Sequence, residues 1–182
     1  MSFKQAFLFP FLTHHDYFES YAWSMELTIR MKTRLQVFTT SPSTYHNLDS
    51  TASIYHSLLE AQGYYLQHYL QKGIRPNVLR EPCIEPGELE EKLIFHIRQN
   101  PDDVVILYPG ILLENQIGLD EIVKEAGGVI ILPEERAAEP DGSTREHFFD
   151  RLRRVQLHKL PGNFLATLGK DHTTFNFLRK LF

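Results

Sequence analysis

The chain has 182 residues, of which 42% are hydrophobic and 23% charged, and this composition is typical of a globular domain and excludes a disordered chain. It contains no run of about 20 apolar residues, so no membrane segment is expected, and its net charge of −4 argues against a nucleic-acid partner. The single cysteine, Cys83, excludes an intrachain disulfide and favours a cytoplasmic location.

The first forty residues alternate between strand and helix patterns. The apolar run at residues 6–12 predicts a strand that is covered on both faces. A helix capped by Thr13 or Asp16 follows, and its apolar stripe extends to about Met31. A second short strand is expected over residues 35–38.

The middle of the chain continues this alternation. Residues 50–73 predict the longest helix, because apolar side chains recur along them at helical spacing. A third strand is expected over residues 77–81. Pro86 is well placed at the start of a further helix, which ends near Asn100.

Two more strands complete the predicted sheet. Residues 104–108 are continuously apolar, and residues 129–132 form a similar run after a short helix around residues 119–126. Strands that alternate with helices in this way indicate a parallel sheet with right-handed crossovers. We therefore predict an α/β fold: a five-stranded parallel sheet in a Rossmann-like three-layer sandwich, with additional C-terminal helices.

The C-terminal part differs from the rest in charge. Residues 1–142 carry 11 Lys/Arg and 20 Asp/Glu, a net charge of −9, whereas residues 143–182 carry 8 and 3, a net charge of +5. We predict an α/β domain at 1–133, a linker at 134–142 and a helical extension at 143–182, with its first helix running to about Leu160. Opposite charges attract, so this extension is expected to pack on the acidic domain, in cis or across a homodimer.

Several segments resemble the universal stress protein family in their order and spacing. They lie at residues 4–10, 35–40, 71–74, 88–107 and 128–133. The resemblance covers about residues 3–133. It implies a five-stranded parallel fold, similar to that of the adenine nucleotide alpha hydrolases, that is commonly dimeric through its last strand, with ATP bound in some members.

The family's ATP-binding members carry Gly-x2-Gly-x9-Gly-Ser/Thr after the fourth strand, and this chain departs from that motif. If Gly110 is the first glycine, Leu113 stands at the second position, and if Gly118 is the first, Glu121 stands there. The bulky side chains at residues 111–113 block the close backbone approach that a phosphate needs. We therefore do not expect ATP or AMP as a cofactor in the family's usual pose.

The leading interpretation of function is a non-enzymatic module that dimerises, because the chain lacks a catalytic motif such as a Gly-x-Ser-x-Gly elbow. The alternative is a nucleotide- or small-ligand-binding protein with a rebuilt site at the strand C-termini, where open α/β sheets bind ligands. Its candidate ligand-binding residues are Phe11, Leu12, Thr13, His14, Thr40, Tyr108, Pro109 and Gly110. A hydrolytic or nucleotidyl-transferring enzyme is a third alternative.

No metal site is expected from the histidines, because His14, His46 and His56 show no HxH or HxxxH spacing. Cys83 lies between Glu81 and Glu85, whose negative charges raise the pKa of a thiol and do not activate it. We therefore expect Cys83 to be a structural or exposed residue.

Overall fold

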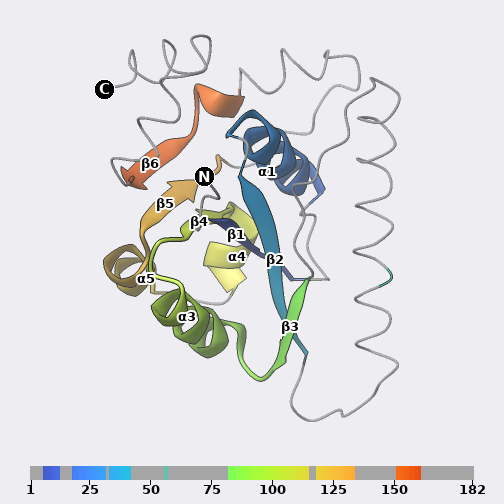
Figure 1. Cartoon of the computed structure of the whole chain (residues 1–182), viewed down its shortest axis with the longest axis vertical. Helices are drawn as coiled ribbons and strands as arrows, with labels where there is room; N and C mark the ends of the chain where they lie inside the picture. Colours follow the sequence, from blue (N-terminus) through green and yellow to red (C-terminus); the bar gives the residue numbers. More distant parts are fainter. Residues whose placement is uncertain are drawn as a thin grey trace.

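The computed structural model describes residues 6–12, 18–31, 33–41, 56, 82–114, 118–133 and 151–160. The described strands form one six-stranded sheet with the order β3-β2-β1-β4-β5-β6 (Figure 1). The strands are β1 Ala6–Pro10, β2 Arg34–Ser41, β3 Cys83–Pro86, β4 Val104–Leu107, β5 Gly128–Ile131 and β6 Gln156–Lys159. The helices are α1 Phe18–Met31, α3 Leu89–Gln99, α4 Pro109–Glu114 and α5 Leu119–Glu125.

The two central strands, β1 and β4, are buried along their whole length. β1 pairs in parallel with β2 on one side and with β4 on the other. Such strands have no solvated face, which explains why their sequences are continuously apolar and do not alternate. The start of β1 is fixed by the Ala6 N–H, which donates to a carboxylate oxygen of the buried Asp103 at 2.7 Å.

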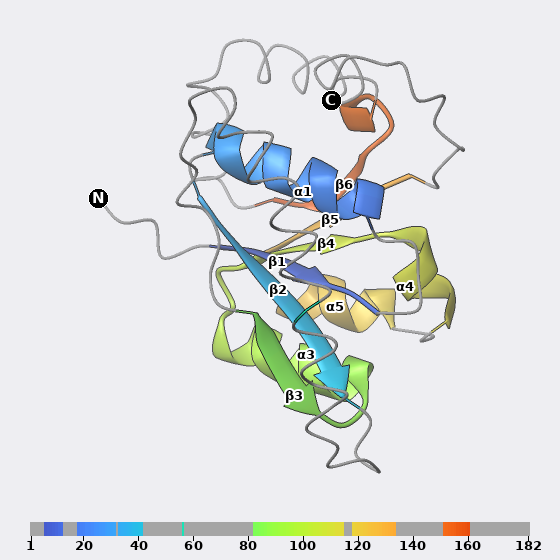
Figure 2. The same cartoon turned by 90° about the vertical axis from the view of Figure 1, so that its right-hand side faces the viewer.

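Helices cover both faces of the sheet (Figure 2). α1 packs on β1 and β2 from one side, whereas α3 and α5 lie on the opposite side, against β2 and β5. The buried side of α1 carries Ser24 and Thr28, whose hydroxyls donate to the carbonyls four residues earlier at 2.8 and 2.6 Å. The three-layer α/β prediction is therefore confirmed, with one strand more than expected.

The structure describes a strand, β3, over residues for which the sequence predicted none. β3 begins at Cys83, and residues 77–81, where a strand was predicted, lie outside the described part of the chain. Pro86 is the last residue of β3 and does not start a helix; α3 begins at Leu89. A proline is tolerated there because β3 ends the described sheet and pairs on one side only, with β2.

The prediction of a helix to about Leu160 is wrong from Arg153 onward. The chain leaves the helix after Leu152, turns, and forms β6, which pairs antiparallel with β5. Leu152 and Val155 are buried in the core of the domain, and the buried Arg151 donates to Ser20 Oγ on α1 at 3.0 Å. The described part of the extension therefore packs in cis.

The remaining predicted elements agree with the structure where it describes them. α1 ends at Met31, α5 spans Leu119–Glu125, and β2, β4 and β5 lie within a few residues of their predicted bounds. The predicted linker at 134–142 lies outside the described residues, and of the predicted helix at 50–73 only His56 is described, in helical conformation. Within the described part of the chain, no helix has the length and apolar character needed to cross a membrane.

Candidate functional site

The edge formed by the C-terminal ends of β1 and β4 holds most of the predicted ligand-binding residues. Phe11 is fully buried and Tyr108 is 2% exposed. Leu12, Thr40, Pro109 and Gly110 are half-buried. Thr13 and His14 lie outside the described residues. The structure therefore brings these residues to one edge of the sheet, and the two aromatic side chains belong to the core.

Hydrogen bonds tie this edge together across three strands. The Phe11 N–H donates to the Phe38 carbonyl at 2.9 Å, and the Thr39 hydroxyl donates to the Phe11 carbonyl at 2.9 Å. The Leu12 N–H donates to the Tyr108 hydroxyl oxygen at 3.3 Å, which links β1 to the end of β4. In an open site, backbone N–H and carbonyl groups would remain available to a ligand. Here the N–H groups of Phe11 and Leu12 and the Phe11 carbonyl form hydrogen bonds within the protein.

Aromatic packing fills the space behind these bonds. The Phe9 ring stacks on the Tyr108 ring with centroids 5.5 Å apart, and it meets the Tyr21 ring of α1 edge-on at 5.8 Å. Such pairs add to the stabilisation that comes from burial. The edge is thus continuous with the core between β1 and α1.

The connection after β4 is a helical turn and not a glycine-rich loop. α4 begins at Pro109, two residues after the end of β4. Ile111 is fully buried, and its N–H donates to the Tyr108 carbonyl at 3.1 Å. Ile111 therefore packs into the core at the position where the family's phosphate loop would follow the strand.

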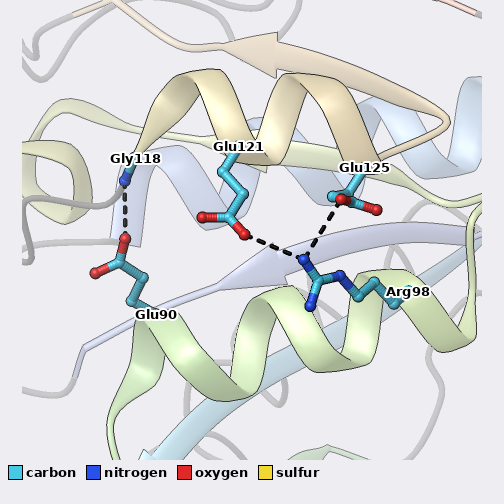
Figure 3. A network of polar contacts seen from close by, with 5 residues as sticks. All are labelled: Glu90, Arg98, Gly118, Glu121 and Glu125. Atoms are coloured by element: carbon cyan, nitrogen blue, oxygen red, sulfur yellow. Dashed lines mark hydrogen bonds and ion pairs between the residues drawn. The ribbon is translucent and has the colours of Figure 1, made fainter.

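A second polar region joins α3 to α5 (Figure 3). Arg98 on α3 reaches Glu121 at 3.2 Å and Glu125 at 3.4 Å, and Glu90 accepts the Gly118 N–H at 3.0 Å. Arg98 and Glu121 are about half exposed, so the ion pairs contribute at most about 1 kcal/mol each. These contacts orient α5 on α3, and we assign them a structural role only.

A shallow depression of about 460 Å³ lies on the outer surface of the same two helices. Its lining comprises Glu91, Lys92, Ile94, Phe95, Arg98 and Glu121. Phe95 is the large apolar side chain that the described surface exposes, at 56%. A single exposed ring is common on protein surfaces and does not define a binding site.

Three side chains of different chemistry converge where β3 meets α3. The Cys83 Sγ, a Glu85 carboxylate oxygen and a His96 ring nitrogen all lie within 4.8 Å of one another. Each of the three residues is half-buried. The Cys83 thiol donates to Glu85 Oε1 at 3.8 Å, and the His96 ring contacts the Phe38 ring with centroids 5.1 Å apart.

The environment of Cys83 disfavours the free thiolate. Burial first, and then the charge of Glu85 and the hydrogen bond to it, raise the pKa of this thiol above its usual value. The direction agrees with the sequence-based expectation. A cysteine nucleophile needs the opposite environment, so Cys83 is unsuited to that role.

Sequence reasoning missed this cluster because it predicted no strand over residues 83–86. Residues 83 and 85 were expected to follow a strand, where side-chain directions are irregular. On β3 they stand two residues apart and share one face. A Cys-x-Glu pair on a strand that is followed by a histidine-containing helix is the signal that points to such a cluster.

No family model and no curated protein matches this chain. Among solved structures, a similar one is universal stress protein UspA from Lactobacillus plantarum, with a TM-score of 0.43 and 11% sequence identity. The match covers 71% of this chain and 97% of that protein. At this identity the likeness concerns the fold alone.

Proposed function

We propose that this chain is a non-enzymatic module, similar to universal stress proteins, that works through contacts with other copies of itself. We further propose that it does not bind ATP or AMP in the usual pose of that family. The observation that carries this proposal is the closed edge at the ends of β1 and β4, where Phe11, Tyr108 and Ile111 are buried.

The backbone amides at this edge support the same conclusion. A phosphate is held by backbone N–H groups that point at it without other partners. The N–H groups of Phe11, Leu12 and Ile111 are each used in a hydrogen bond within the fold. A nucleotide would have to break those bonds and displace buried apolar side chains.

The test is a thermal-unfolding series of the full chain with the Mg²⁺ complexes of ATP and ADP, and with AMP, at millimolar concentration. We expect no shift of the melting temperature. A nucleotide present at about 100 times its dissociation constant would stabilise the fold by about 2.7 kcal/mol, which for a chain of this size raises Tm by about 5–10 °C. A shift of that size would overturn the proposal, as would ATP hydrolysis above the buffer rate.

Self-association is the second element of the proposed function. The outer side of β5 is paired with β6 of the same chain, so a dimer through directly paired β5 strands would require β6 to leave. We therefore propose a homodimer in which β6, the terminal strand of the described sheet on that side, lies at the contact. Light scattering should give twice the mass of the chain, and a monomer at every concentration tested would contradict it.

A further inference from the structure

We propose that Cys83, Glu85 and His96 form a binding site for a divalent transition-metal ion of the zinc class. The site goes beyond the proposed function and does not depend on it, since it lies at β3 and α3 and not at the ends of β1 and β4. Its donors are a thiol sulfur, a carboxylate oxygen and an imidazole nitrogen, which are the three types of side-chain ligand that Zn²⁺ takes in proteins.

The fold brings these donors together by simple geometry. Cys83 and Glu85 project from the same face of β3 because they are two residues apart on a strand. Gly87, at a φ of +122°, turns the chain, and α3 then lies on that side of the sheet. His96, in the last turn of α3, meets the pair, and a helix C-terminus is an environment that favours positive charge.

The spacing of the donors fits a tetrahedral ion. Zn–S bonds of about 2.3 Å and Zn–N or Zn–O bonds of about 2.0 Å place neighbouring ligand atoms about 3.5 Å apart. The Cys83 Sγ and Glu85 Oε1 are already 3.8 Å apart, and no pair in the cluster exceeds 4.8 Å. Rotation of the half-buried glutamate and histidine side chains is sufficient to close the remaining gap.

The immediate surroundings support the site. Phe38 on β2 is fully buried, and its ring packs against that of His96 with an interplanar angle of 53°, which restrains the imidazole. Cys83 is the register partner of Phe38 and packs against the core, so the sulfur is also restrained. Two of the three ligands are therefore kept near the site by packing before any ion arrives, and only small rotations are needed for bonding.

The donor set also selects among metals. Mg²⁺ and Ca²⁺ prefer all-oxygen sites, whereas a mixture of thiolate, imidazole and carboxylate favours Zn²⁺ and its neighbours Co²⁺ and Ni²⁺. Binding converts the thiol to a thiolate, and its proton leaves to solvent. The three described donors leave a fourth tetrahedral position for water or for a ligand from a partner.

The experiment uses the full chain, stripped with a chelator and titrated with Co²⁺ alone and then with Zn²⁺ alone. Co²⁺ should produce the near-ultraviolet charge-transfer absorption of a thiolate ligand, and Zn²⁺ should abolish it by competition. Because Cys83 is the only cysteine, labelling with a thiol reagent reports on this one group, and Zn²⁺ should slow the labelling.

Variants at the three ligands identify the site. Loss of a residue that merely supports a metal ligand costs about 10–100-fold in affinity, so C83S and H96Q should each weaken Zn²⁺ binding by at least about 100-fold. E85Q leaves the thiol in place and should remove the protection of Cys83 by Zn²⁺. H56Q and E91Q alter an exposed histidine and an exposed carboxylate outside the cluster, and should bind like the wild type.

Three outcomes would overturn the proposal. They are a Co²⁺ spectrum without thiolate absorption, Zn²⁺ affinity that is equal in wild type and C83S, and labelling of Cys83 that Zn²⁺ does not slow. Circular dichroism of each variant shows whether it is folded, and E85Q keeps the test decisive if H96Q fails to fold. Nucleotides play no part in these measurements, so their result is independent of the proposed function.

Discussion

Two regions of this sheet treat their polar groups in opposite ways. At the C-terminal ends of β1 and β4, in the middle of the sheet, backbone N–H groups donate to backbone carbonyls and to a tyrosine hydroxyl, and aromatic rings fill the space. At β3, the strand at the end of the described sheet, three side chains with metal-binding atoms face one another while half-buried. In the first region the polar groups hydrogen-bond within the fold. In the second, three side chains keep atoms that could bind a ligand.

The proposed metal site departs from the rule that locates binding sites in α/β folds at the central strand ends. That rule rests on the exposed helix N-termini and loops that meet there. Here the buried Ile111, in the turn of α4, replaces the loop. Strand side chains project from the faces of a sheet, and at β3 those of Cys83 and Glu85 meet His96 of α3.

The two regions should differ most in how much the loss of one side chain destabilises the fold. Phe11→Ala removes a fully buried ring at the closed edge and should lower the free energy of unfolding by about 3–5 kcal/mol. Cys83→Ala removes a half-buried atom and should cost about 1 kcal/mol or less. Urea denaturation of both variants and the wild type measures the contrast. Equal losses would mean that the two regions do not differ in structural role.

Most of the fold was predictable from the sequence because the central strands are unambiguous. Residues 6–12 and 104–108 are apolar without interruption, and runs of this length favour a buried strand over a helix of ten or more residues. The filled edge was also predictable in part, since the bulky Ile111 follows Gly110 and Leu113 stands at the position of the motif's second glycine. The sequence assigned Phe11 and Tyr108 both to buried strands and to the candidate ligand site, and in the structure their side chains lie in the core.

The errors lie where local patterns are ambiguous. Leu152 and Val155 are three residues apart, which suits a helix, yet Val155 and Leu157 are two apart, which suits a strand. Pairing with β5 decides in favour of β6, and that contact is about 27 residues distant in sequence. The cluster at β3 was missed for a related reason, because Pro82 and Pro86 suggested the end of a strand and the start of a helix.

A smaller effect should come from the turn that connects the two halves of the cluster. Gly87 has a φ of +122°, which side-chain-bearing residues rarely adopt, and a Cβ there would lie 3.1 Å from Lys92 Cε. The contact falls on a flexible lysine and is relieved by rotation, so the backbone conformation dominates the cost. Gly87→Ala should lower the free energy of unfolding by about 1–3 kcal/mol, less than Phe11→Ala.

Gly87→Ala also tests the proposed metal site, because it changes the turn beside the cluster and leaves the three ligand residues unchanged. A shifted turn moves Glu85 relative to His96, so Zn²⁺ should bind Gly87→Ala at least about tenfold more weakly than the wild type. Lys92→Ala is the matched control: it removes the side chain nearest to Gly87 and keeps the glycine, so both stability and Zn²⁺ affinity should stay close to wild type. Unchanged Zn²⁺ affinity in a destabilised Gly87→Ala would show that the turn supports the fold and does not position the donors.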